Sequence, residues 1–337
     1  MQLFYSSDNP DIRWKWQKAV IYIALFFGFW GFYLLSVGYS EASGAFSYSS
    51  DDTVIGFKQI HTIKDDDTLL DLARQYDIGY NSIIAANPGI DPWIPKKDTK
   101  ILIPTMWVLP DASHDGVVIN LAEMRLYYFF KVPQTQSNFM VRTFPIGVGT
   151  EGFVTPYGSY HVADKEKNPT WHVPESIRKE KPFLPLSVPP GHDNPLGKFI
   201  LHLSLPGYGI HGTNKPLGVG RRVSHGCIRL YPEDIARLFP MVPVGTKVTV
   251  TYEPVKIGVR DGDIYIEVHD DYLKQAGNLY NYAVKKLIKL GLLKDVDLDS
   301  LRKAIKDKSG VPTPISKKYP DENLAGGRHL PPAEQLN

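Results

Sequence analysis

Short apolar runs divided by glycine and proline fill the middle of the chain, and they most constrain how it can fold. Between residues 117 and 250, apolar and polar residues alternate for a few positions before a turn-forming residue interrupts each run. Period-two alternation is typical of a strand with one buried face. The 28 glycines and 27 prolines show no fixed period and favour a loop-rich β protein over a helical one. We therefore expect a mainly β domain over 107–252, built as a β-sandwich or barrel.

The N-terminal region predicts that the chain is exported. Residues 19–37 carry no charge and are long enough to cross a bilayer. Three basic residues precede this run within 1–18, and none follows until Lys58, so the bulk of the chain is expected outside the cytoplasm. The small residues of "SEASGA" (40–45) suit signal peptidase. The segment 19–40 is therefore either a cleaved signal peptide or a retained membrane anchor.

Cys227 is the only cysteine of the chain, and its surroundings predict that it reacts. Exported proteins normally pair their cysteines, so a lone thiol is a liability unless its reactivity is used. In "SHGCIRL" (224–230) apolar residues alternate with His225, Cys227 and Arg229, which would share one face of an extended segment. Gly226 would let a substrate approach closely. An inert buried thiol is the alternative, but three reactive side chains on one face favour a site.

A thiol nucleophile needs a base, and His211 is the candidate. It lies at the end of a predicted short strand, "YGIHG", after which Gly212 opens a loop that returns to the cysteine segment. His211 would thus face Cys227 across a hairpin-like connection. Zinc is the competing interpretation, because two histidines and a cysteine could ligate it. No fourth ligand stands at motif spacing, so we expect neither a metal nor another cofactor.

The spacing of these residues resembles a known signature. His211, thirteen further residues and then "SHGCIR" (224–229) are similar to the motif of the L,D-transpeptidase catalytic domain of the YkuD type. Surrounding stretches agree, among them "GVVINLAEMRLYYF" and "FPIGVGTEGFVTPYGSYHV". Within that family the chain resembles the Gram-negative branch that attaches Braun-type lipoprotein to peptidoglycan. The resemblance implies a periplasmic enzyme, with residues 19–40 as its export signal or inner-membrane anchor.

The resemblance also implies roles for individual residues. Cys227 would be the nucleophile, His211 the proton donor and acceptor, His225 a supporting residue and Gly226 a backbone donor to the oxyanion. The substrate-binding residues would be Arg229, Ser224, Gly212 and Arg222, with Arg221 as the alternative to Arg222. A thiolate nucleophile would make acylation slower as the pH falls. Carbapenems would be expected to acylate Cys227.

The expected reaction is acyl transfer in cell-wall remodelling. A peptidoglycan tetrapeptide stem would lose its terminal D-alanine and pass to a lipoprotein lysine or to the diaminopimelate of a second stem. Water as acceptor would instead give a carboxypeptidase or amidase, and a non-catalytic wall-binding protein is a further alternative. The expected partners are stem peptides, glycan, a Braun-type lipoprotein and, through the N-terminal segment, the membrane. A net charge of +2 gives no basic field for nucleic acid.

Residues 57–105 resemble a LysM module. A strand, a helix over 68–76 with Asp67 as N-cap, a second helix over 81–86 and the closing strand "TKILIPT" are expected. The resemblance implies binding of glycan that contains N-acetylglucosamine. A small packing domain without ligand affinity is the alternative.

The C-terminal region predicts an accessory segment. Residues 253–308 should form a strand at 262–273, in which His269 is structural, and a helix over 273–293 with apolar residues on one side. The stretch 309–337 is rich in proline and charge, and we expect it to be disordered.

Overall fold

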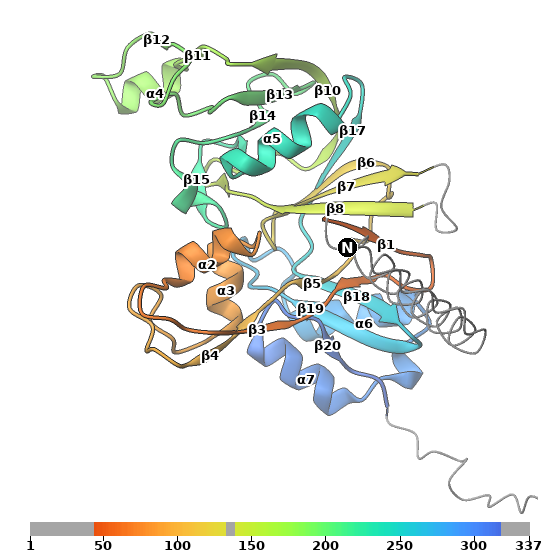
Figure 1. Ribbon diagram of the computed structural model, residues 1–337. Coiled ribbons are helices and arrows are strands. Elements are labelled where there is room, and N and C mark those ends of the chain that lie inside the picture. The colour runs from red at the N-terminus through yellow and green to blue at the C-terminus, as the bar shows by residue number, and fades with distance from the viewer. Residues whose placement is uncertain (1–43, 133–138, 318–337) are drawn as a thin grey trace, which may run out of the picture. The chain divides into compact units, whose positions relative to one another are not determined.

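The computed structural model describes residues 44–132 and 139–317 (Figure 1). The described chain begins with a short strand, β1 (Ala45–Ser47). The apolar run 19–37 lies outside the described residues, so the cleaved signal or anchor stays a prediction. Within the described ranges, no helix combines the length and apolar character needed to cross a membrane.

The LysM-like region contains a strand, two helices and a closing strand, as the sequence predicted. Strands β3 and β4 pair antiparallel, with Gln59 opposite Ile103, and α3 lies against both α2 and β4. A second antiparallel pair, β2 with β5, flanks these elements in the chain. The bounds are β2 (Val54–Gly56), β3 (Gln59–Thr62), α2 (Leu69–Gln75), α3 (Tyr80–Ala86), β4 (Lys100–Ile103) and β5 (Met106–Val108).

The N-cap of α2 differs from the predicted one. Thr68 caps the helix, and its Oγ1 accepts a hydrogen bond from the Asp71 N–H at 3.1 Å. The Asp67 carboxylate instead lies 2.8 Å from Nε2 of His61 and accepts the Lys64 N–H at 2.8 Å. These two hydrogen bonds, that of His61 first, lower the pKa of Asp67. Asp67 therefore fixes the turn before the helix.

The region 107–252 is mainly β, as predicted, and is built around one large mixed sheet. From β8 to β16 the strand order is β8-β7-β6-β17-β10-β13-β14-β16. The pairs β6–β17 and β14–β16 are parallel, whereas the other neighbours are antiparallel. The sheet is open at β16, so it is not a closed barrel. The bounds are β6 (Gly116–Asn120), β7 (Arg125–Lys131), β8 (Phe139–Pro145), β10 (Gly158–Lys167), β13 (Phe199–Leu203), β14 (Gly209–His211), β16 (Ile228–Arg229) and β17 (Lys247–Thr251).

Shorter elements surround this sheet. Two small strand pairs, β9 with β15 and β11 with β12, flank the loops that lead to residues 224–229. The bounds are β9 (Val148–Gly149), β11 (Trp171–His172), α4 (Glu175–Glu180), β12 (Ser187–Val188), η1 (Pro216–Gly218), β15 (Arg222–Ser224) and α5 (Pro232–Met241).

Helix α5 supports the strands that carry the predicted site. It begins at Pro232, which suits a first turn whose N–H groups have no helical partner. Ile235 of α5 belongs to the same buried cluster as Ile210 of β14 and Ile228 of β16. Figure 1 shows α5 beside β13 and β14. This packing holds the ends of β14 and β16 in place.

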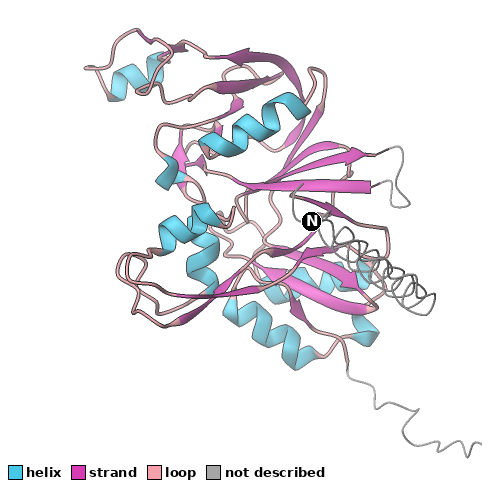
Figure 2. Ribbon diagram, in the orientation of Figure 1, coloured by secondary structure: helices cyan, strands magenta, loops and turns pink. Residues whose placement is uncertain are grey.

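The C-terminal region forms a separate three-stranded sheet with two helices (Figure 2). The order is β18-β19-β20, and the bounds are β18 (Val255–Arg260), β19 (Asp263–Val268), β20 (Thr313–Pro314), α6 (Leu279–Lys289), η2 (Leu293–Asp295) and α7 (Leu298–Asp307). The helix predicted over 273–293 is shorter, because Gly277 has a φ of +63° and Asn278 caps α6. The prediction of disorder is wrong at β20, which pairs with β19. Residues 318–337 lie outside the described part.

A buried group of charges joins this sheet to the region 107–252. The Lys256 ammonium lies 2.7 Å from Oε2 of Glu123 and 3.1 Å from Oε1 of Glu267. His269 Nε2 lies 2.7 Å from Oε1 of Glu267, consistent with the structural role predicted for this histidine. Glu123, Glu267 and His269 lie close enough to hold a metal ion, but the ammonium already lies between the two carboxylates. The group therefore serves as a structural ion pair.

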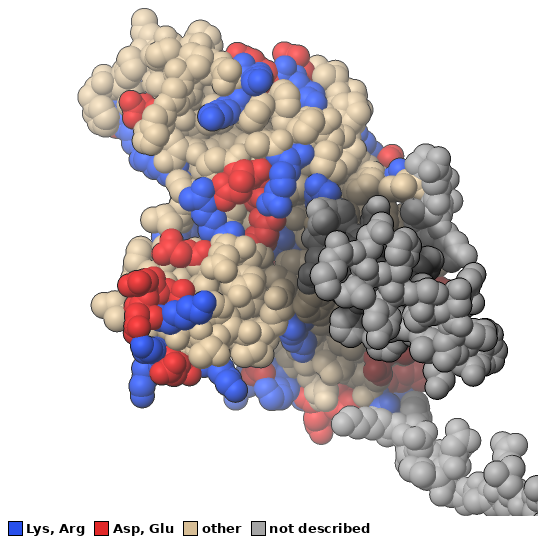
Figure 3. Space-filling view, in the orientation of Figure 1, with Lys and Arg blue, Asp and Glu red and all other residues tan. Residues whose placement is uncertain are grey.

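Acidic and basic side chains occur together on one face of the described chain (Figure 3). On the face shown in Figure 3, blue basic side chains and red acidic side chains are interspersed over the described part of the chain. This distribution agrees with the small net charge of +2. A nucleic-acid-binding surface would instead gather basic side chains on one face.

Candidate active site

Parallel pairing of β14 and β16 brings the predicted base and nucleophile segments together. Ile210 pairs with Ile228, and His211 pairs with Arg229. The sequence had suggested a hairpin-like connection, which would be antiparallel. The loop after His211 instead crosses over, so that both strands run in the same direction. Cys227 comes directly before β16 and lines the same groove as His211.

Cys227 follows a tight turn, so the extended segment predicted for 224–230 is interrupted. Gly226 has a φ of +107°, and a Cβ there would lie 2.6 Å from Cε1 of Tyr208. Only glycine adopts this conformation in this space without strain. The Ser224 hydroxyl donates to the Cys227 carbonyl at 2.6 Å and accepts the Gly226 N–H at 3.1 Å. Thr155 donates to the Gly226 carbonyl at 2.6 Å, which fixes the turn from the other side.

His211 is buried and neutral, with one nitrogen available as a base. Its Nδ1 lies 2.6 Å from the Gly212 carbonyl oxygen. Because a carbonyl only accepts hydrogen bonds, Nδ1 carries the proton and Nε2 keeps its lone pair. Burial first, and then the positive charge of Arg229, lower the pKa of His211 to about 3. Gly212, predicted to bind substrate, therefore orients the base in this structure.

The Cys227 thiol is also neutral in the resting site. Burial raises its pKa, and the opposing effects of the Gly209 backbone and the Arg229 charge do not outweigh that rise. Its Sγ lies 3.7 Å from the Gly207 carbonyl oxygen. A preformed thiolate, which we expected from the sequence, is therefore disfavoured. Because both groups are neutral at rest, the thiol proton would pass to His211 only as the sulfur attacks.

A groove of about 1080 Å³ contains most of the predicted residues. Five of them line it, namely Cys227, His211, His225, Arg229 and Ser224. The Nε of Arg229 is buried and has no hydrogen-bond partner among the described residues. Arg229 is half-buried and its side chain lines the groove, so its guanidinium is suited to bind a carboxylate there.

Arg221 and Arg222, which precede the segment 224–229, lie in different environments. Arg221 lines the groove, and its guanidinium carbon lies 3.6 Å from the ring centroid of Tyr80. Arg222, the residue predicted to bind substrate, is absent from the lining, and its guanidinium lies 4.6 Å from the ring centroid of Tyr272. Arg221 stands before β15 and Arg222 is its first residue, and the two side chains contact different aromatic rings. The structure thus favours Arg221 over Arg222 as a groove residue.

His225 contacts a segment that the sequence did not connect with the site. Its Nε2 lies 3.0 Å from Oε2 of Glu180, at the end of α4, and its ring packs edge-on against Phe153. Residues around α4 also line the groove, including Trp171, Ile177 and Phe183. His225 therefore contacts the wall of the groove, and the supporting role stays a prediction. No pattern in the sequence connected Glu180 with His225.

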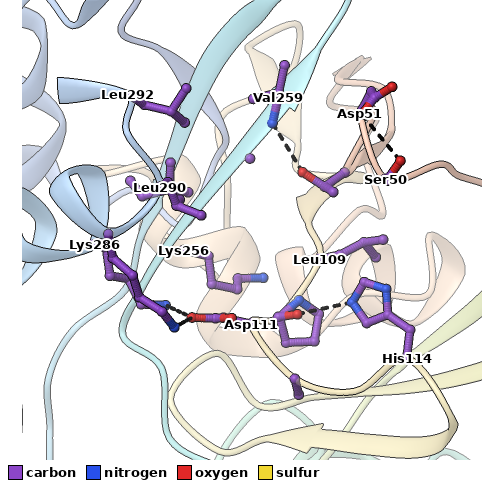
Figure 4. A pocket seen from close by; sticks show the side chains of 16 residues that line it. Ser50, Asp51, Leu109, Asp111, His114, Lys256, Val259, Lys286, Leu290 and Leu292 are labelled. Carbon is purple, nitrogen blue, oxygen red and sulfur yellow. Dashed lines mark hydrogen bonds and ion pairs between the residues drawn. The ribbon is translucent and has the colours of Figure 1, made fainter. Parts of the chain in front are cut away.

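A second cavity, of about 560 Å³, lies next to the C-terminal helices and contains none of the predicted residues. Figure 4 shows the Lys286 ammonium directed at Asp111, and it also lies 2.7 Å from Oε2 of Glu253. His114 Nε2 lies 3.1 Å from the Pro110 carbonyl oxygen. These polar groups already pair with protein groups, so we place the candidate active site in the groove of Cys227.

Comparison with known proteins finds similar sequences in one family. The family model YkuD, described as the L,D-transpeptidase catalytic domain, matches residues 114–250, and that of the LysM domain matches 61–104. "Probable L,D-transpeptidase YbiS" of Escherichia coli is 38% identical over 301 residues, which cover 83% of this chain and 95% of that protein. "Probable L,D-transpeptidase ErfK/SrfK" of Escherichia coli is 37% identical over 76% of this chain and 85% of that protein. The solved catalytic domain of an Enterococcus faecium L,D-transpeptidase matches at 23% identity with a TM-score of 0.32, over 42% of this chain and 99% of that one.

The chain therefore belongs to the L,D-transpeptidase family of cysteine-dependent enzymes. Beyond the catalytic domain it contains a LysM domain, and the pair of domains implies binding and remodelling of cell-wall peptidoglycan.

Proposed function

We propose that this chain transfers the acyl group of a peptidoglycan tetrapeptide stem to an amine, through a thioester on Cys227. The observation that carries the proposal is that Cys227, the neutral base His211 and the guanidinium of Arg229 line one groove. These are a nucleophile, a proton acceptor and a carboxylate partner, which together suffice for acyl transfer from an anionic peptide.

The first step forms the thioester. The Sγ of Cys227 attacks the carbonyl of the third stem residue, at the L-centre of diaminopimelate, while the thiol proton moves to Nε2 of His211. The C–N bond to the terminal D-alanine then breaks. Its amine takes the proton from His211 and leaves as free D-alanine. Neutral reactants suit this step, because the buried groove disfavours both the thiolate and the imidazolium before attack.

The oxyanion of the tetrahedral intermediate needs N–H donors. The Gly226 N–H, the donor that the sequence suggested, already donates to the Ser224 hydroxyl. We therefore assign the Cys227 N–H as the donor, held in position by the hydrogen bond of its carbonyl to Ser224. One such donor contributes about 3 kcal/mol to acyl transfer in other enzymes.

The second step transfers the acyl group. An amine attacks the thioester carbonyl, the C–S bond breaks, and the amine proton passes through His211 to the sulfur. The acceptor is a lipoprotein lysine or the diaminopimelate of another stem. Arg229 and Arg221 bind the carboxylates of the donor stem, because a guanidinium accommodates a carboxylate in a bidentate manner.

The LysM domain and the N-terminal segment place the reaction in the cell wall. The LysM domain binds the glycan strand and keeps the catalytic groove near its stems. The apolar run 19–37 exports the chain to the periplasm, where it is removed or retained as an anchor.

Mass analysis of muropeptide products tests this proposal. The full-length protein is incubated with disaccharide tetrapeptide and a peptide that ends in lysine. We expect release of D-alanine together with lysine-linked or cross-linked stems, and no products from the Cys227→Ser variant. Tripeptide as the only product would show water to be the acceptor. Unchanged masses with folded protein would show a non-catalytic wall-binding protein and refute the proposal.

A further inference from the structure

Four side chains from neighbouring strands form one row across the floor of the catalytic groove. Glu166 of β10 pairs with Ile200 of β13, Ile200 pairs with His211 of β14, and His211 pairs with Arg229 of β16. All four line the groove. Directly paired residues of a sheet share a face, so the row runs from an acidic end to a basic end with the base between them.

The side chain of Glu166 points into the groove. Its neighbour Lys165 points to the opposite face and donates to the Phe239 and Val242 carbonyls at the C-terminal end of α5. Glu166 is 49% exposed, and the nearest charged partner is His202, whose Nε2 lies 3.7 Å from Oε2 of Glu166. A hydrogen bond does not form at that distance. The carboxylate pairs with His202 only when that histidine is protonated, and its exposure leaves it accessible to a ligand in the groove.

The two ends of the row suit the two substrates of the proposed reaction. A donor stem is anionic and belongs at the Arg229 end. An amine acceptor is an ammonium ion at neutral pH, which Arg229 repels and Glu166 attracts. Adjacent strands lie about 4.8 Å apart, so the backbones of Glu166 and His211 are separated by roughly 10 Å, and both side chains line the same groove.

We propose, on the basis of the function proposed above, that Glu166 is the acceptor subsite and binds the primary ammonium group of the incoming amine. From there the amine passes over Ile200 to the thioester beside His211. The ammonium loses one proton to solvent before attack. A second proton passes from the new amide nitrogen through His211 to the sulfur as the C–S bond breaks. Water carries no charge and gains nothing from Glu166, so this carboxylate favours transfer over hydrolysis.

The partition between transfer and hydrolysis tests this subsite. Full-length wild-type protein and the Glu166→Gln variant receive disaccharide tetrapeptide with one of three acceptors. Two are ammonium ions, a peptide ending in lysine and a tripeptide stem with diaminopimelate, and their separate yields show which source is used. The third, hydroxylamine, is neutral at pH 7. We expect Glu166→Gln to lower the transfer-to-hydrolysis ratio about tenfold for whichever ammonium acceptor is used. The ratio for hydroxylamine and the release of D-alanine without amine should stay unchanged.

Two further variants separate recognition from stability. Glu166→Asp keeps the charge and should restore most of the ratio. Asp164→Asn removes one negative charge from the same strand outside the groove lining and should leave the ratio unchanged. An unchanged ratio in Glu166→Gln, or an equal loss with hydroxylamine, would overturn the subsite. Absence of D-alanine release by the wild-type protein would instead overturn the proposed function, so the two failures are distinguishable.

Discussion

Replacing Ser224 by alanine removes the hydroxyl that holds the nucleophile turn. This hydroxyl donates to the Cys227 carbonyl at 2.6 Å and accepts the Gly226 N–H at 3.1 Å. Ser224 is only 1% exposed, so water does not readily replace the hydroxyl. The sequence resemblance gives Ser224 a role in substrate binding, whereas the structure gives it a role in positioning Cys227.

The expected cost follows from the two backbone groups that lose their partner. Each unsatisfied buried group costs about 1–3 kcal/mol, so the loss of both partners in Ser224→Ala should lower the free energy of unfolding by about 2–6 kcal/mol. The released turn also moves the sulfur relative to His211. Since a displacement of about 1 Å costs on the order of 100-fold in rate, acylation of Cys227 should slow by about that factor.

Chemical denaturation and the rate of acylation by a carbapenem measure these two effects. Ser204→Ala is the matched control, because the Ser204 hydroxyl also accepts a backbone N–H, that of His161 at 3.1 Å, but is exposed. Its effect on both quantities should be small. An unchanged unfolding midpoint and acylation rate in Ser224→Ala, with only a raised KM for the stem, would refute the positioning role and support substrate binding.

Three other perturbations test the site and its support. Because the pKa of His211 is lowered to about 3 and burial raises that of Cys227, both groups stay neutral from about pH 5 to about pH 8. The acylation rate should be constant over that range. A rate that falls toward low pH with a midpoint at about pH 6.5 would indicate an imidazolium–thiolate pair at rest. His211→Ala should abolish D-alanine release while His269→Ala largely preserves it, and equal losses would show that the base is wrongly assigned. Lys256→Met leaves two buried carboxylates without their cation and should destabilise the fold by about 3–5 kcal/mol in denaturation. An unchanged midpoint would contradict this.

Local patterns were sufficient to place the nucleophile segment. Ile228 and Leu230 alternate with Cys227 and Arg229 in the sequence, and the two apolar residues are fully buried in the structure. The strand that ends at His211 could likewise be predicted from the sequence, because a glycine stands at each of its ends. Such features depend on neighbours within a few residues, which the sequence displays directly.

Contacts between distant segments were not readable in this way. The direction of β16 relative to β14 depends on how the intervening loop crosses, and alternation is the same for either direction. Glu180 lies 45 positions before His225, and no local pattern connects them. Burial also decides whether the thiol and the imidazole are charged, and it becomes visible only once the strands have packed. For the same reason the choice between Arg221 and Arg222 required the structure.

Intact-mass spectrometry with peptide mapping tests the central assignment most directly. The reduced, folded protein is incubated with a carbapenem, whose strained carbonyl reports an active thiol next to a base without the need for an acceptor. A single adduct of the carbapenem mass that maps to Cys227, and that is absent from Cys227→Ser, is the predicted result. Absence of an adduct on the folded protein, or an adduct that maps to a serine, would contradict the assignment of Cys227 as the nucleophile.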